Sequence, residues 1–181
     1  MSKQPFRLET ERLVLRRFRA EDGDALALLL TDPEVCWFEP YEVMTQAQAV
    51  EEAAKFADHE DFYAVTRRDT DELIGKLYLG DQKFFGAYEL GYTFRRDMWG
   101  NGYALESACA IMQYAFTVLG ARRIIAEADI RNTRSCRVLE KLGMRREGVF
   151  VQSAAFQKDE SGKPIWSDYC FYAILQDEFL K

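Results

Sequence analysis

The stretch MWGNGYALESACAIMQYAF, residues 98–116, places two glycines directly before a long helix-like segment. Residues 87–94, AYELGYTF, precede it and are predicted to form a strand. Glycine lets the backbone turn sharply and lets an anion approach without a Cβ in the way. The unpaired N–H groups of a helix start attract anions, and the helix dipole adds partial positive charge there. The stretch therefore indicates either a phosphate-binding loop or a tight turn without a ligand, and one G-x-G pattern does not separate the two.

The bulk composition is that of a globular protein. At 181 residues the chain can bury a core without disulfides or metal, so we expect a single domain over residues 1–181. Hydrophobic residues make up 48% and charged residues 30%, which excludes disorder, and no apolar run could span a membrane. The N-terminus lacks the apolar run of a signal peptide, so we expect a cytoplasmic protein. The net charge of −6 disfavours nucleic-acid binding and is compatible with amine-bearing partners.

Cysteine and histidine usage limits the chemistry. Cys36, Cys109, Cys136 and Cys170 are widely separated and form no CxxC pair, so we expect reduced packing residues and no metal site. His59 is the only histidine, which excludes a histidine-based triad. Acid–base chemistry must therefore depend on carboxylates, hydroxyls, water or the substrate.

Strand-like and helix-like segments alternate along the chain. Thr45 and Asn132 are predicted N-caps, and Gly120 and Gly143 are predicted to end helices. Strands are expected at 12–18, 62–68, 73–81, 87–94, 122–130, 150–156 and 165–175, and helices at 20–30, 45–57, 103–119 and 132–142. The expected fold is of the α/β (α+β) class, a mixed sheet with helices on both faces.

Three motifs occur in a specific order: LETERLVLR at 8–16, WGNGYALES at 99–107 and NTRSCRVLEKLG at 132–143. Together they resemble the GNAT superfamily of acyl-CoA-dependent N-acetyltransferases. Most of the superfamily has Gln or Arg where Trp99 opens the glycine loop. A tryptophan at this position resembles the Rim-type branch, the ribosomal-protein N-terminal acetyltransferases. The resemblance implies one GNAT-like domain with a mostly antiparallel, splayed sheet. It also implies acetyl-CoA as co-substrate, no metal, and an amine acceptor that is a small molecule or a protein N-terminus; nucleic acid and membrane are not expected partners, and a homodimer is left open.

The resemblance further implies where the coenzyme binds. Its pantetheine arm would pair with the edge exposed between segments 89–94 and 124–130, because its amides satisfy unpaired backbone groups. The expected contacts are Tyr92, Thr93 and Phe94 with the arm, Trp99, Gly100, Asn101, Gly102, Tyr103, Ala104 and Leu105 with the diphosphate, and Asn132 and Ser135 at the start of the next helix.

Two residues are catalytic candidates by resemblance. Ser135, or a bound water, would protonate the thiolate leaving group, since Leu139 stands where many GNAT enzymes have a tyrosine. Glu127 would act as general base through water. Ser135 as a simple helix residue and Glu127 as an outward strand carboxylate are the alternatives. Cys136 has no histidine to activate it, so we expect direct transfer in a ternary complex.

The aromatic connection CWFEPYEV, residues 36–43, is apolar for a loop. By resemblance it forms one wall of the acceptor groove, and the turn and strands near residues 156–166 form the other. The substrate-binding candidates are Trp37, Phe38, Glu39, Tyr41 and Trp166; the alternative for each aromatic residue is simple packing. The expected function is acetyl transfer to a primary amine. A non-catalytic acyl-CoA-binding module remains the alternative, whereas nucleotide binding is disfavoured because no G-x-x-x-x-G-K-[ST] motif is present.

Overall fold

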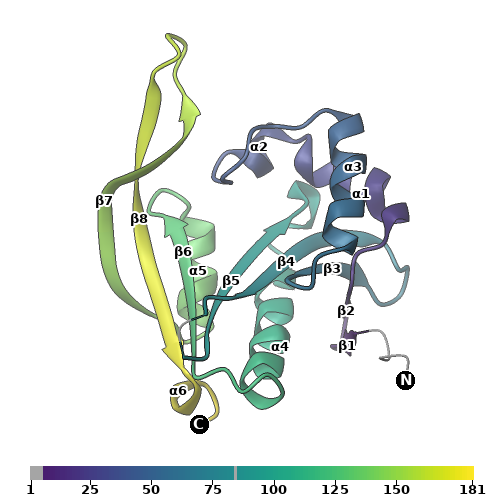
Figure 1. The fold of residues 1–181 in the computed structure, drawn as a ribbon, viewed down its shortest axis with the longest axis vertical. Helices are drawn as coiled ribbons and strands as arrows, with labels where there is room; N and C mark the ends of the chain where they lie inside the picture. The colour runs from purple at the N-terminus through teal and green to yellow at the C-terminus, as the bar shows by residue number, and fades with distance from the viewer. Residues whose placement is uncertain (1–5, 84) are drawn as a thin grey trace.

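The computed structural model describes residues 6–83 and 85–181, which contain one open eight-stranded sheet (Figure 1). The strand order is β1-β2-β3-β4-β5-β6-β8-β7. The strands are β1 Arg7–Glu9, β2 Leu13–Arg16, β3 Phe62–Arg67, β4 Leu73–Asp81, β5 Ala87–Phe94, β6 Arg123–Asp129, β7 Arg145–Lys158 and β8 Pro164–Leu175. All neighbouring strands are antiparallel except β5 and β6, which are parallel. The predicted mixed, mostly antiparallel sheet is confirmed.

Helices cover both faces of the sheet, as predicted (Figure 1). One face carries α1 (Gly23–Leu30), α2 (Pro33–Cys36) and α3 (Gln46–Ala57), and the other carries α4 (Tyr103–Thr117) and α5 (Thr133–Lys141). A short helix, α6 (Gln176–Phe179), follows the last strand, and 3₁₀ turns occupy Ala20–Asp22 and Arg96–Met98. Within the described residues, no helix has the length and apolarity that crossing a membrane requires.

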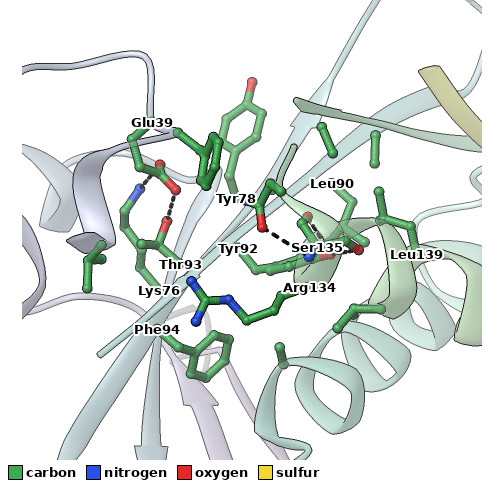
Figure 2. A pocket seen from close by; sticks show the side chains of 18 of the residues that line it. Glu39, Lys76, Tyr78, Leu90, Tyr92, Thr93, Phe94, Arg134, Ser135 and Leu139 are labelled. Atoms are coloured by element: carbon green, nitrogen blue, oxygen red, sulfur yellow. Dashed lines mark hydrogen bonds and ion pairs between the residues drawn. The ribbon is translucent and has the colours of Figure 1, made fainter. Parts of the chain in front are cut away.

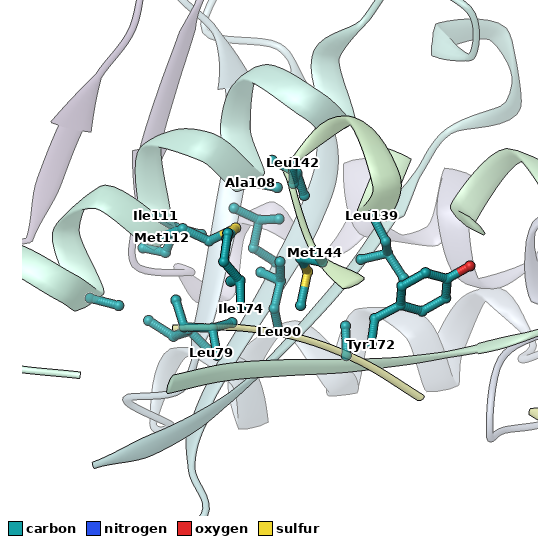
Figure 3. Packing of buried hydrophobic residues seen from close by; sticks show 14 of the residues in the cluster. Leu79, Leu90, Ala108, Ile111, Met112, Leu139, Leu142, Met144, Tyr172 and Ile174 are labelled. Atoms are coloured by element: carbon teal, nitrogen blue, oxygen red, sulfur yellow. The ribbon is translucent and has the colours of Figure 1, made fainter. Parts of the chain in front are cut away.

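Two hydrophobic clusters hold these layers together. The larger lies between the sheet and α4 and α5, where Leu90, Ile111, Met112 and Ile174 are at most 3% exposed (Figure 3). The smaller lies under α1 and α3. Burial of a side chain of this size contributes about 1.5–3 kcal/mol, so these contacts fix the position of α4 and α5 against the central strands.

The ends of the elements follow local chemistry. Thr45 and Asn132 cap α3 and α5, and the Asn132 Oδ1 atom accepts a hydrogen bond from the Ser135 N–H at 3.2 Å. Strand β1 and helix α2 were not predicted, and two predicted elements end differently in the structure. Helix α4 ends at Thr117, so Gly120, with φ +69°, lies in the following turn and is not the cap. Strand β7 is longer than the predicted 150–156, because it stays paired with β8 across three register shifts.

The centre of the sheet opens between β5 and β6. The two strands pair only at Ala87–Glu89 with Arg123–Ile125. Beyond this point β5 stays paired with β4 as far as Phe94, and β6 stays paired with β8 as far as Asp129. The two halves of the sheet therefore diverge, and the splay that the sequence predicted is confirmed.

Candidate active site

A cavity of about 900 Å³ occupies the opening between β5 and β6. Alternate residues of a strand point to opposite faces of a sheet. Leu90 and Tyr92 accordingly face α4 and α5, whereas Glu89, Gly91 and Thr93 face the side of α2 and α3. Since residues from both sets line the cavity, it connects the two faces of the sheet (Figure 2).

The glycine loop forms one end of this cavity. Gly100 and Gly102 have φ values of +82° and +81°, a conformation that non-glycine residues adopt at a cost of about 1–2 kcal/mol. Gly102 is the N-cap of α4 and provides no side-chain cap, so the first-turn N–H groups remain free to bind an anion. The Trp99 Nε1 atom donates to the Phe94 carbonyl at 2.9 Å, which fixes the loop to the end of β5.

The N-terminal segment braces the same loop. The Glu106 carboxylate accepts hydrogen bonds from Thr10 Oγ1 at 2.6 Å and from Arg12 Nε at 2.7 Å. Arg12 Nη1 also donates to the Asn101 carbonyl at 3.0 Å. Burial opposes ionisation of Glu106, yet these hydrogen bonds hold its pKa below the ordinary value. The Asn101 amide donates to the Met98 carbonyl at 3.1 Å, so this side chain supports the loop and does not line the cavity.

Helix α5 adds positive charge that the sequence analysis did not identify. Arg134, Arg137 and Lys141 line the cavity, and within the described residues none of them forms an ion pair. The Arg134 guanidinium lies 3.7 Å from the centroid of the Trp99 ring. The spacing i, i+3, i+7 puts the three cations on one helix face, which was a usable sequence signal.

The first turn of α5 also brings two hydroxyl groups together. Ser135 Oγ lies 3.0 Å from the Tyr92 Oη atom, which is also 3.1 Å from the Ser135 carbonyl oxygen (Figure 2). Burial raises the pKa of Tyr92 well above its ordinary value. Leu139, one turn later, is 1% exposed and supplies no donor. The sequence predicted the Tyr92 backbone at this site but not its hydroxyl.

Two carboxylates face the cavity on the opposite side of the sheet. Glu89 on β5 and Glu127 on β6 both line it, and the Glu89 Oε2 atom accepts a hydrogen bond from Gln82 Nε2 at 2.8 Å. Burial and the nearby Glu127 charge raise the pKa of Glu89. Glu89 was missed as a site residue, although strand alternation with Gly91 and Thr93 placed it on this face.

The connection between α2 and α3 forms the outer wall through Glu39. Its Oε1 atom accepts a hydrogen bond from Thr93 Oγ1 at 3.0 Å, and its Oε2 atom lies 3.8 Å from Lys76 Nζ (Figure 2). Lys76, only 8% exposed, lies 5.0 Å from the centroid of the Tyr41 ring and was not singled out from the sequence.

The predicted site residues divide into two groups. Trp37 and Trp166 are 45% and 55% exposed and, with Asn101, lie outside the cavity lining. The structure gathers the others around one cavity: Phe38, Glu39, Tyr41, Tyr92, Thr93, Phe94, Trp99, Gly100, Gly102, Tyr103, Ala104, Leu105, Glu127, Asn132 and Ser135. The described part of the chain contains no cluster of three or more metal-ligating side chains, and its four cysteines are free thiols.

Comparison with known proteins gives the class. The family model described as an acetyltransferase (GNAT) domain matches residues 12–145. The uncharacterized N-acetyltransferase YnaD of Bacillus subtilis is 35% identical over 175 residues, covering 95% of this chain and 98% of YnaD. A solved GNAT-family acetyltransferase from Bacillus anthracis is 31% identical, with a TM-score of 0.85, covering 96% of this chain and all of that one. The chain belongs to the GNAT family and is an acyl-CoA-dependent N-acetyltransferase.

More distant structures share the fold alone. They include a ribosomal-protein-S5-alanine acetyltransferase from Vibrio fischeri at 19% identity, with a TM-score of 0.76 and coverage of 96% of this chain and 98% of that one. A spermidine N-acetyltransferase from Vibrio cholerae, solved with CoA and spermine, has 20% identity and a TM-score of 0.79, and the match covers 95% of this chain and all of that one.

Proposed function

We propose that the protein transfers an acetyl group from acetyl-CoA to a primary amine by direct attack in a ternary complex. The observation that carries the proposal is the cavity between β5 and β6, which connects a cationic face with a carboxylate face. Two substrates could enter from opposite faces and meet within the sheet. Positioning two reactants in this way removes about 7–11 kcal/mol of a bimolecular barrier in favourable cases.

The residues around the cationic face fit coenzyme A. The free N–H groups after Gly102 suit a diphosphate, and Arg134, Arg137 and Lys141 offer unpaired cations for phosphate oxygens. Beyond Glu89, the edge of β5 that no longer pairs with β6 suits the amides of the pantetheine arm. When bound, acetyl-CoA supplies the acetyl group already activated as a thioester.

On the opposite face, Glu89 and Glu127 bind the acceptor ammonium and accept its proton. A carboxylate pair attracts a cationic amine, and a carboxyl whose pKa is raised is a more effective base. Ser135 donates a hydrogen bond to the leaving thiolate. Cys136 is buried, and burial raises the pKa of its thiol, which supports direct transfer without an acyl-enzyme.

The acceptor is a primary amine on a small molecule or on a protein N-terminus. The Trp99 loop and the segment Asn132–Gly143 favour the Rim-type branch, and the fold likeness to a ribosomal-protein acetyltransferase is compatible with it. The fold likeness to a spermidine acetyltransferase is equally compatible with a small amine, which the two carboxylates suit.

A product screen tests the proposal. The protein is incubated with acetyl-CoA and either a panel of amines or a cell extract, and acetylated products are identified by mass. We expect at least one amine to gain an acetyl group and the Glu127→Gln variant to make less of the same product. Tight acetyl-CoA binding without any acetylated product would favour a non-catalytic acyl-CoA-binding module.

A further inference from the structure

Tyr92 lines the reaction cavity, and its hydroxyl group is not used by the proposed mechanism. Tyr92 is on the diverging part of β5, beyond the last residue paired with β6. Its side chain faces α5 and reaches the first turn of that helix, where Oη lies 3.0 Å from Ser135 Oγ (Figure 2). Leu139, one turn later on α5, contributes only hydrocarbon.

Proton counting allows two arrangements of this hydroxyl pair. If the phenol donates to the Ser135 carbonyl, at 3.1 Å, Ser135 Oγ can donate to the phenol oxygen, and neither proton then points into the cavity. If the phenol donates to Ser135 Oγ instead, the serine proton is free for an acceptor in the cavity. A thiolate beside Ser135 favours the second arrangement, because a hydrogen bond to a charged acceptor is stronger than one to a neutral acceptor.

We propose that Tyr92 is a positioning residue that turns the Ser135 hydroxyl toward the leaving thiolate and polarises it, replacing the donor that Leu139 cannot provide. The inference rests on the proposed function. Burial keeps the phenol protonated, so the pair donates hydrogen bonds and remains neutral. The thiolate takes its final proton from water, and no phenolate forms.

Other ionisable groups surround the pair. Arg134 and Cys136 lie beside Ser135 on α5, and Glu89 and Glu127 line the same cavity from the other face of the sheet. These groups are unchanged when the phenol hydroxyl alone is removed. A difference between the parent and Tyr92→Phe therefore reports the hydroxyl pair.

The test is the thiol pKa of coenzyme A bound to the protein. It is measured from the ultraviolet absorbance of the thiolate as pH is varied, with the complex of the desulfo analogue as blank. Ser135→Ala removes the donor to the thiolate itself and should raise the bound thiol pKa by about 1–2 units. Tyr92→Phe removes only the group that orients and polarises Ser135, so it should raise the pKa measurably but by less, and the double variant should raise it no further than Ser135→Ala does.

Tyr114→Phe is the matched control, because it removes a phenol hydroxyl from α4 outside the cavity lining and should leave the bound thiol pKa unchanged. An unchanged thiol pKa in Tyr92→Phe, or in Ser135→Ala should the first variant fail to fold, would overturn the inference. Failure of the parent to bind coenzyme A in calorimetry would overturn the proposed coenzyme site instead.

Discussion

Gly102→Glu is the most direct test of the glycine loop. The residue has φ +81°, so any side chain there costs about 1–2 kcal/mol in backbone strain. For a chain of this size that lowers Tm by about 2–8 °C. Among the described residues, chain neighbours aside, a Cβ at this position meets Arg12 Nη2 at 3.5 Å and no other atom within 4 Å, so the new side chain has room and the fold should survive.

The new carboxylate should weaken coenzyme binding far more than it lowers stability. Two like charges 4 Å apart repel by about 1 kcal/mol in bulk water and about 4 kcal/mol near a protein surface. The dissociation constant of acetyl-CoA should therefore rise by roughly 5- to 1000-fold, measured by calorimetry. Gly120→Glu is the control, because φ is +69°, a Cβ there meets no described atom within 4 Å beyond its chain neighbours, and the residue is outside the cavity lining. Equal affinity losses in the two variants, or none in Gly102→Glu, would refute the reasoning.

Three further predictions concern the reacting groups. Ser135→Ala should slow single-turnover acetyl transfer by about 10- to 1000-fold with little change in acetyl-CoA affinity; a parent-like rate would show that Ser135 is not the donor to the thiolate. Glu127→Gln should lower the rate most near neutral pH and less as pH approaches the acceptor pKa, whereas a loss equal at all pH values would indicate a binding role. Burial and Glu127 raise the pKa of Glu89 in the folded state, so its ionised form is destabilising at neutral pH. Glu89→Gln should raise Tm at pH 7, and the gain should vanish below the ordinary glutamate pKa of about 4.3; a gain independent of pH in thermal unfolding would contradict this.

The sequence predicted the elements more completely than their contacts. Strand alternation and the caps at Thr45 and Asn132 are local properties, so one segment at a time was enough to identify them. Gly120 was misassigned because the same residue suits a cap and a following turn, and only the helix length separates these. The extent of β7 was missed because pairing with β8, rather than its own pattern, determines where it begins and ends.

Contacts between distant segments were beyond local patterns. The motifs LETERLVLR and WGNGYALES give no reason to pair Thr10 with Glu106, which are 96 residues apart. The Tyr92 hydroxyl was missed for the same reason, because its contact with Ser135 exists only where α5 crosses the diverging end of β5. Lys76 follows a glycine inside a strand, and nothing in that pattern indicated its approach to Glu39.

The parting of β5 and β6 also makes the thermodynamic stability of the fold depend on metabolite supply. Backbone groups that a continuous sheet would pair are left to solvent there, so the free protein forgoes part of the stability its strands could provide. A ligand that occupies the gap stabilises the folded state by about 2.7 kcal/mol at a hundred times its dissociation constant. Since unfolded chains are removed by proteolysis in cells, the amount of this enzyme should rise and fall with the cellular pool of coenzyme A.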